Sequence, residues 1–338
     1  MTSVVSTHQV QTPSIDESSD GQRLDNFLAK FCQGVPKSHL YQLIRSGQVR
    51  VNKGRARPDT RLALGDVVRI PPIRMKDKPV ASDSGMRQRS LAELGRRLPV
   101  QFEDDALLII DKPVGTAVHG GSGVSSGVIE QLRAARPSAR YLELAHRLDR
   151  DTSGLLILAK SRPTLRRMHE LFRQGKMDKR YVAIALGNVP RRDKTIKLPL
   201  TRTERPGGER LVLVDPNGKP ALTTIIGAGS VELRAIGPVS LVSVSLGTGR
   251  THQIRVHLAA SGWPVLGDAR YGQFEVNRRA AQQGYSRMYL HARELSFVHP
   301  GSNERIVVRS GWPAAFSELF SEPPERPGSG TRRLNGQA

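Results

Sequence analysis

Cysteine, aromatic residues and long apolar runs are all scarce in this chain. Its 338 residues include a single cysteine, Cys32. One cysteine cannot form an intrachain disulfide, and it excludes any metal site built from several cysteines. The apolar runs are strand-sized, which excludes a transmembrane helix, and the polar N-terminus lacks the pattern of a signal peptide. We therefore expect a cytoplasmic protein with no metal site and no membrane partner.

Acidic residues are also few compared with basic ones. The chain has 52 Lys and Arg against 31 Asp and Glu, and its formal net charge is +21. Such an excess indicates a polyanionic partner, either nucleic acid or an anionic membrane surface. Because no segment is apolar enough to enter a bilayer, nucleic acid is the expected partner.

Composition divides the chain into five segments. We expect a disordered tail, a compact basic module, a linker, a large domain and a second disordered tail, over residues 1–20, 21–72, 73–98, 99–320 and 321–338. The tails are polar and without periodicity, and the linker combines prolines with mixed charges. A short helix is expected within the linker, at residues 91–97.

The basic module has the periodicity of two amphipathic helices. Apolar residues recur at helical spacing, and Pro36 and Gly47 mark the ends of the second helix. The predicted helices and the two short strands that follow them cover residues 24–31, 36–47, 49–51 and 66–70. Ten Lys or Arg and three Asp lie between Gly21 and Pro72, so this module alone carries a net charge of +7.

The segments RLDNFLAKF, SHLYQLIRSGQVRVNK and GDVVRIPP, in that order, resemble a small S4 (αL-type) RNA-binding domain. In that family the second helix and the turn after it contact RNA. The resemblance implies RNA contacts for six residues, namely Lys37, Ser38, Arg45, Arg50, Lys53 and Arg55.

Short β-type runs dominate the larger domain. They are predicted at residues 106–111, 155–159, 180–186, 211–214, 222–226, 231–235 and 241–246, with helices at 163–174 and 250–261. Strands that cluster with few helices between them are typical of an α+β fold with a mostly antiparallel mixed sheet. That is the fold class we expect.

The charged stretch from His146 to Gly154 is the strongest candidate for chemistry. The run Leu155–Ala159 that follows it is continuously apolar and reads as a buried strand. A loop fixed to such a strand can hold a reactive side chain. Neighbouring arginines keep a carboxylate ionised, which suits a nucleophile or base. The alternative interpretation is a solvated turn rich in charge.

The segment HRLDRDTSG resembles the signature of the RluA-type family of pseudouridine synthases, in which the aspartate after His-Arg-Leu is catalytic. That residue is Asp149 here. The segments LLIIDKP, GTAVHGG, KRYVA and GTGRTHQIRVH agree with the same family. The resemblance implies that Tyr181 lies against the target uracil and that Arg255 pairs with Asp149.

Further contacts to RNA are expected beside this centre. The family fills the gap left by a flipped uridine with side chains next to the aspartate, which makes Arg147 and Arg150 candidates. Arg250 and the amides of a glycine-flanked helix start could hold phosphate, and we group His252 with these contacts. The five-residue spacing of His252 and His257 puts them on different helix faces and disfavours zinc.

Pseudouridine formation breaks the N1–C1′ bond and joins C5 to C1′, so no redox cofactor or group donor is expected. Asp149 could attack C6, attack C1′ or abstract the 2′ proton, and these three routes stay open. The S4 domain and the wording GTAVHGGSG most resemble the bacterial ribosomal large subunit pseudouridine synthase C group of the family. This implies 23S ribosomal RNA as the substrate, no guide RNA, and a monomer.

Two other functions remain to be distinguished. One is a non-catalytic S4-type RNA-binding factor for ribosome assembly. The other is an RNA-cleaving or base-releasing enzyme that uses Asp149 with His146 or His252, which would give strand breaks or free uracil. The joint presence of Asp149, Tyr181 and Arg255 favours the isomerase.

Overall fold

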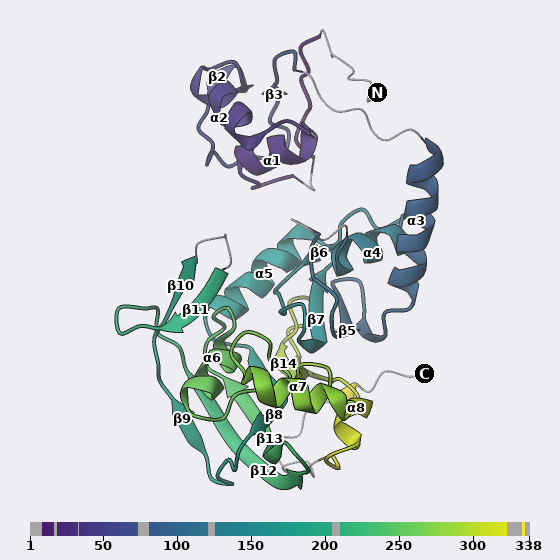
Figure 1. The fold of residues 1–338 in the computed structure, drawn as a ribbon. Helices are drawn as coiled ribbons and strands as arrows, with labels where there is room; N and C mark the ends of the chain where they lie inside the picture. Colours follow the sequence, from purple (N-terminus) through teal and green to yellow (C-terminus); the bar gives the residue numbers. More distant parts are fainter. Residues whose placement is uncertain are drawn as a thin grey trace. The chain divides into compact units, whose positions relative to one another are not determined.

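The computed structural model describes residues 9–16, 19–32, 34–73, 81–120, 126–204, 210–322 and 333–334. The chain divides into two compact units, made of residues 1–90 with 138–141 and of residues 91–137 with 142–338 (Figure 1). Helix α3 (Ala81–Arg96) contains the division between them. The segment predicted as a linker is thus helical over more of its length than the short helix at 91–97 that we expected.

The first unit contains the two predicted helices and a small sheet. Its elements are α1 (Leu24–Phe31), α2 (Lys37–Arg45), β1 (Arg50–Val51), β2 (Gly54–Arg55) and β3 (Val68–Arg69). The strands are antiparallel in the order β2-β1-β3. Leu24 and Leu28 of α1 share a buried core with Leu40 and Ile44 of α2, so the helical spacing read from the sequence is that of the buried faces.

A segment before α1 belongs to this unit as well. Gln11 forms a bridge with Ile70, and the amide of Ile15 donates to the carbonyl of Asp66 at 2.8 Å. The Ile15 side chain is buried. The prediction of a disordered tail through residue 20 is therefore wrong for residues 9–16, because one buried isoleucine in a polar run gives no periodic signal.

The second unit is built on a large, mainly antiparallel sheet. Its strands are β4 (Val100–Glu103), β5 (Leu107–Lys112), β6 (Glu143–Leu144), β7 (Ser153–Ala159), β8 (Asp178–Leu186), β9 (Lys194–Ile196), β12 (Thr223–Leu233), β13 (Gly237–Leu246), β14 (Leu290–Val298), β15 (Arg305–Arg309) and β16 (Arg333–Leu334). The main path is β4-β5-β7-β14-β8-β13-β12-β9. Among the described strand pairs, β7 with β14 and β15 with β16 are parallel.

A separate hairpin and five helices complete this unit. They are β10 (Leu200–Glu204) with β11 (Arg210–Val214), and α4 (Val128–Ala135), α5 (Arg162–Arg173), α6 (Gln253–Ala260), α7 (Phe274–Gln282) and α8 (Ala314–Ser317). Within the described residues, no helix combines the length and the apolar character needed to cross a bilayer.

Strands β5 and β7 are buried on both faces. Residues Leu108 and Leu156 pack in a core with Leu132 of α4, whereas Ile109 and Ile157 belong to a second core with Met168 of α5. Strands covered on both faces read as continuous apolar runs rather than alternating ones. This explains the unbroken apolar sequence after the charged loop, and it gives that loop a rigid base.

The sheet differs from the prediction at several strands, since β4, β6, β9, β15 and β16 were not predicted. The runs expected at 222–226 and 231–235 form one strand, β12, with a bulge between Gly227 and Gly229. A Cβ atom at Gly227 would lie 2.6 Å from the Val189 carbonyl oxygen, so glycine here permits a close approach rather than a break. Strand β14 was not predicted, because His291 and other polar residues interrupt its apolar pattern.

Candidate active site

The charged loop that holds Asp149 is fixed where it enters β7. Gly154 has a φ of +108°, and a Cβ there would lie 2.3 Å from the carbonyl oxygen of Ala292 on β14. Only glycine allows the parallel strands to approach so closely at this backbone conformation. The amide of Thr152 donates to the Asp149 carbonyl at 3.2 Å and closes the turn.

A buried lysine fixes the same loop from β5. The Lys112 side chain is fully buried, and its Nζ donates to the carbonyls of Pro113, Thr116 and Arg150 at 2.9, 2.8 and 2.9 Å. Three acceptors match the three protons of an ammonium group. Burial lowers the pKa of Lys112 to about 8 despite neighbouring carboxylates. Lys112 therefore ties the end of β5 to the backbone next to Asp149.

Asp149 is held by an arginine that is itself held by a second carboxylate. Nη1 of Arg255, on α6, donates to Asp149 Oδ2 at 2.9 Å. Its Nε and Nη2 donate to Asp268 Oδ2 and Oδ1, both at 2.8 Å. The side chains of Asp149, Arg255 and Asp268 are 18, 6 and 0% exposed. The pairing of Arg255 with Asp149 that the resemblance implies is therefore present.

Arg255 and Asp268, which are both buried, each stabilise the charged form of the other. Burial opposes the charge on Arg255, but its bonds to Asp268 and Asp149 hold its pKa above the usual value. Burial alone would raise the pKa of Asp268, yet Arg255 and two backbone amides hold it below its usual value. A bidentate pair of this kind has a fixed geometry, so the Nη1 that reaches Asp149 is fixed too.

His252 and Tyr271 form the other side of this centre. His252 Nε2 lies 3.7 Å from Asp149 Oδ1, and its Nδ1 lies 2.7 Å from the Tyr271 hydroxyl. The Tyr271 ring also lies under the Arg255 guanidinium, 5.0 Å from centroid to carbon. Burial lowers the pKa of His252, which favours the neutral form of its ring. His252 precedes α6 in a left-handed conformation, with φ of +53°.

Tyr181 begins the buried part of β8 near Asp149. Its side chain is 9% exposed, and burial followed by the negative charge of Asp149 raises its pKa. The phenol is therefore neutral. Among the described residues its hydroxyl has no hydrogen-bond partner, so it is available to a substrate.

The turn before α6 is organised by Gln253. Its Oε1 accepts from the Thr248 hydroxyl at 2.7 Å and from the Arg250 amide at 2.9 Å, and its Nε2 donates to the Leu222 carbonyl. The amide of Arg250 is thus already bonded. Our expectation that free amides of this turn bind phosphate is wrong at that position, although the Arg250 side chain is exposed and, among the described residues, donates only through Nε, to Pro220.

Arg147 and Arg150 are both exposed on the Asp149 loop. Arg150 Nε lies 3.2 Å from Asp151 Oδ1. Asp151 therefore pairs with the neighbouring guanidinium of the same loop. Of these two arginines, only Arg150 forms an ion pair among the described residues.

His146 has a structural role. Its Nε2 accepts the amide of Ile157 at 3.0 Å, and its ring lies 5.2 Å from that of Phe172. Burial lowers the pKa of His146 to about 4. A ring nitrogen occupied by the backbone cannot serve as an acid or base, which removes His146 from the base-releasing alternative.

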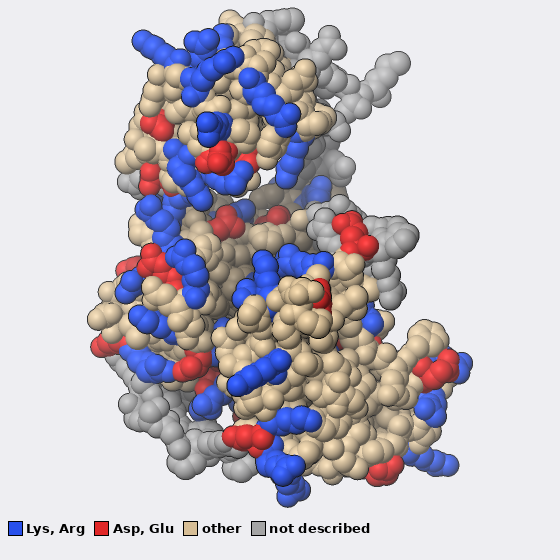
Figure 2. Space-filling model, turned by 90° about the vertical axis from the view of Figure 1, so that its left-hand side faces the viewer, with Lys and Arg blue, Asp and Glu red and all other residues tan. Residues whose placement is uncertain are grey.

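All six residues predicted to contact RNA in the first unit are exposed. Three arginines lie side by side across its sheet, because Arg50 pairs with Arg55 of β2 and with Arg69 of β3. We call Arg50, Arg55 and Arg69 the arginine row. Arg50 and Arg69 also donate to the carbonyls of Gly47 and Gln48, in the turn that ends α2. Lys and Arg gather on the face of this unit seen in Figure 2.

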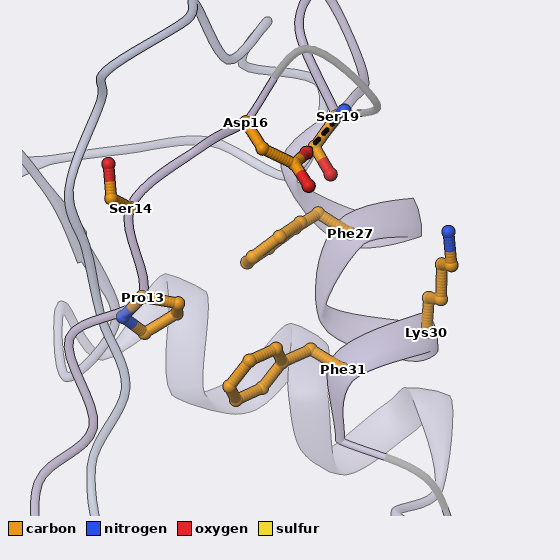
Figure 3. Close-up of a pocket in the computed structure, with 7 residues that line it drawn as sticks. All are labelled: Pro13, Ser14, Asp16, Ser19, Phe27, Lys30 and Phe31. Atoms are coloured by element: carbon orange, nitrogen blue, oxygen red, sulfur yellow. Dashed lines mark hydrogen bonds between the residues drawn. The ribbon is translucent and has the colours of Figure 1, made fainter. Parts of the chain in front are cut away.

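The first unit also contains a small pocket of about 290 Å³ (Figure 3). It is lined by Pro13, Ser14, Asp16, Ser19, Phe27, Lys30 and Phe31. The rings of Phe27 and Phe31 stack at 5.7 Å, and the Ser19 amide donates to Asp16. None of the site residues predicted from the sequence lines this pocket.

Sequence reasoning missed Asp268 and Tyr271, and it gave Lys112 no role. The available signal was the segment Gly267 to Gly272, in which an acid and a tyrosine lie between two glycines. Gly267 has a φ of +76°, and a Cβ there would lie 1.9 Å from a backbone oxygen. Within the described ranges, no group of three or more His, Cys, Asp or Glu could hold a metal ion.

Two family models match the chain. The model described as RNA pseudouridylate synthase matches residues 106–260, and the S4 domain model matches residues 22–68. Ribosomal large subunit pseudouridine synthase C of Yersinia pestis is 46% identical over 304 residues, which are 89% of this chain and 91% of that protein. The protein of the same name from Escherichia coli (strain K12) is 46% identical over 308 residues, covering 90% and 93%.

Two solved structures of human RNA pseudouridylate synthase domain proteins also align with this chain. Human RNA Pseudouridylate Synthase Domain Containing 1 aligns with a TM-score of 0.55 and 28% identity, over 65% of this chain and 85% of that one. Human RNA Pseudouridylate Synthase Domain Containing 4 aligns with a TM-score of 0.52 and 25% identity, over 69% and 95%. The predicted α+β fold class with an S4 domain is confirmed. The chain belongs to the RNA pseudouridylate synthase family.

Proposed function

We propose that this chain isomerises uridines of 23S ribosomal RNA to pseudouridine, with Asp149 as the nucleophile. The observation that carries the proposal is the state of the Asp149 carboxylate. Its Oδ2 is bonded to the buried Arg255, whereas its Oδ1 accepts no hydrogen bond from the described residues. One oxygen is therefore fixed and the other is free to react.

The isomerisation conserves every atom of the RNA, which is why it requires no cofactor. A uridine must first leave the base stack so that C1′ or C6 can reach Asp149. The carboxylate then bonds C1′, bonds C6 or takes the 2′ proton, and the electrons of the N1–C1′ bond pass to the uracil ring. After the ring turns, C5 bonds C1′ and loses its proton. Each route starts from the carboxylate form of Asp149, which Arg255 holds in place through Oδ2.

The neighbouring residues support the base and the gap it leaves. Tyr181 offers a neutral phenol with a flat apolar face, which suits contact with a nucleobase. Arg147 is exposed on the same loop as Asp149 and is the candidate to fill the vacated space, with Arg150 held back by Asp151. The exposed guanidinium of Arg250 is a candidate phosphate contact.

The first unit provides the attraction to RNA. Besides the arginine row, this unit exposes Lys37, Ser38 and Arg45 on α2 and Lys53 in the turn between β1 and β2. Like charges opposite each other in a sheet are destabilising, and an anionic backbone relieves that repulsion. This arrangement supports RNA contact by α2, the hairpin and the row together.

We also infer that the enzyme acts alone. The S4 segment, residues 21–72, and the catalytic segment, residues 99–320, are parts of one chain, so no guide RNA or second subunit is required for binding or chemistry. A monomer in the cytoplasm is the simplest form consistent with a ribosomal RNA substrate.

The test is a map of pseudouridine across 23S ribosomal RNA from cells that lack the gene. Complementation with the wild type should restore the lost sites, whereas Asp149→Ala and Asp149→Asn should restore none while still binding the RNA. Restoration by either variant would exclude Asp149 as the nucleophile. A map unchanged by loss of the gene would refute the 23S substrate and favour the non-catalytic assembly factor.

A further inference from the structure

We propose that His252 is a further catalytic residue: as a neutral imidazole, it donates a hydrogen bond from Nε2 to the uracil ring when negative charge develops there, and Tyr271 positions it. This rests on the proposed function and adds a group to it. Sequence analysis placed His252 among the RNA contacts, and gave it a chemical role only in the alternative of an RNA-cleaving or base-releasing enzyme.

The hydrogen bonds around Tyr271 determine which nitrogen of His252 carries the proton. The Tyr271 oxygen accepts the amide of Val212 at 3.0 Å, so one of its acceptor positions is filled. Within the described part of the chain, the only acceptor near its O–H is His252 Nδ1, at 2.7 Å. The phenol is half-buried and has no other acceptor within hydrogen-bond distance among these residues, so we assign its proton to the bond with Nδ1. The proton of the neutral ring is then on Nε2.

That proton faces the reacting oxygen of Asp149 without being bonded to it. The distance from Nε2 to Asp149 Oδ1 is 3.7 Å, too long for a hydrogen bond. The His252 side chain is only 13% exposed, so the position of its ring is restricted. A group that approaches Oδ1 from the open side comes within reach of the Nε2–H as well.

Burial favours the neutral form of His252. Burial, with Arg255 and Arg270, lowers the pKa of His252 and outweighs Asp149 and Asp268, which favour its protonation. A cation at this position would pair with Asp149 and weaken the nucleophile. A neutral donor stabilises an anion next to Asp149 without neutralising the carboxylate.

The chemistry requires such a donor in each route. Cleavage of the N1–C1′ bond leaves its electron pair on the uracil ring, and addition at C6 also puts negative charge on ring oxygens. A fixed donor aimed at developing charge stabilises the transition state more than the ground state. His252 donates a hydrogen bond and keeps its proton, so it needs no reprotonation between turnovers.

Tyr271 links this donor to the β10–β11 hairpin. Val212, whose amide bonds the phenol, lies on β11, and the ring of Tyr271 packs with Val212 and Leu200 of the same hairpin. The phenol also lies against Arg255. Tyr271 is therefore a positioning residue that depends on the hairpin for its own orientation.

The experiment compares His252→Gln with His252→Asn in the full chain. The terminal amide of glutamine reaches the position of Nε2, whereas that of asparagine reaches only the position of Nδ1. Asparagine tolerates the left-handed backbone at this position better than most residues, so its defect would not come from backbone strain. The measurement is single-turnover tritium release from C5-labelled uridine in unmodified 23S ribosomal RNA, together with RNA affinity.

We expect His252→Gln to stay within about tenfold of the wild type and His252→Asn to be slower by on the order of 10²-fold, with RNA affinity unchanged in both. Tyr271→Phe should slow the single-turnover step several-fold without weakening binding. Equal rates for the Gln and Asn variants, or a loss that follows RNA affinity, would overturn the inference. Absence of tritium release by the wild type would refute the proposed function itself, and the inference with it.

Discussion

The arginine row of the first unit differs in burial and in partners from the two positive charges that hold Asp149 and its loop in the second. The arginine row is exposed, and the bonds of Arg50 and Arg69 go to carbonyls of a turn. Arg255 and Lys112 are buried, and their nitrogens are bonded to defined acceptors around Asp149. Exposed charges act together through a long-range, salt-screened field, whereas buried ones determine the positions of single atoms. The first kind suits attraction of RNA and the second suits chemistry.

Among substitutions that test this contrast between buried and exposed charges, we expect Asp268→Asn to have the largest effect on activity and stability. The substitution keeps the shape of the side chain but leaves Arg255 with one anionic partner and one unmatched donor. We expect single-turnover activity to fall by about 10²-fold or more, since small displacements of a reacting group are costly. Unfolding in urea should show a loss of about 3–5 kcal/mol, typical of a broken buried pair.

Asp151→Asn is the matched control for Asp268→Asn, because Asp151 pairs at the surface with the exposed Arg150. It should change stability by less than about 1 kcal/mol. Equal activity for Asp268→Asn and the wild type would show that a buried acid is not needed to hold the arginine.

Lys112→Met should have an intermediate effect. It removes the shared donor of three carbonyls and leaves a fully buried site without its ammonium group, and we expect a loss of about 2–4 kcal/mol in the free energy of unfolding at neutral pH. Burial lowers the pKa of Lys112 to about 8, below its usual 10.5. The unfolded chain therefore binds more protons between these values, and the wild type gains stability relative to the variant as pH rises from 8 to 10.5.

Thermal or urea unfolding of both proteins across that pH range measures this gain. Lys176→Met, at an exposed lysine, should show no such trend. A difference between the wild type and Lys112→Met that shrinks with rising pH would contradict the lowered pKa.

The smallest effect per residue is expected in the arginine row. Arg50→Gln should weaken RNA binding severalfold and reduce the slope of log affinity against log salt by about 1. Changing all three arginines should reduce the slope by about 2–3, because exposed charges contribute nearly independently. Arg278, which pairs with Glu275 on α7, offers a control. An unchanged slope in the triple variant would place the RNA elsewhere.

The fold was predictable mainly in segments where buried residues recur at a regular spacing in the sequence. The helical spacing around Leu24 and Leu40 gave both helices of the first unit, and the apolar run Leu155–Ala159 gave most of β7. Strand β14 was not predictable, because its polar residues are buried through distant partners. His291, for example, bonds Ser153 and Ser310, and neither is near it in the sequence.

The same contrast applies to the active site. The pairing of Arg255 with Asp149 followed from the family resemblance across 106 positions, and no periodicity would have indicated it. Asp268 and Lys112 escaped notice because each acts through partners that only the folded backbone brings together. A buried polar residue carries no local signal of its partner, so such groups require a structure.

Arg255 bonds only one oxygen of Asp149, and this affects how a covalent intermediate on Asp149 would break down. If Oδ1 forms an ester with C1′, Oδ2 becomes the ester carbonyl and stays bonded to Nη1. The guanidinium then draws electrons from that carbonyl, which weakens the bond between Oδ1 and C1′ and makes the carboxylate a good leaving group when C5 attacks. The contact that prepares the nucleophile would also release the product, and the enzyme would avoid being trapped as a stable adduct.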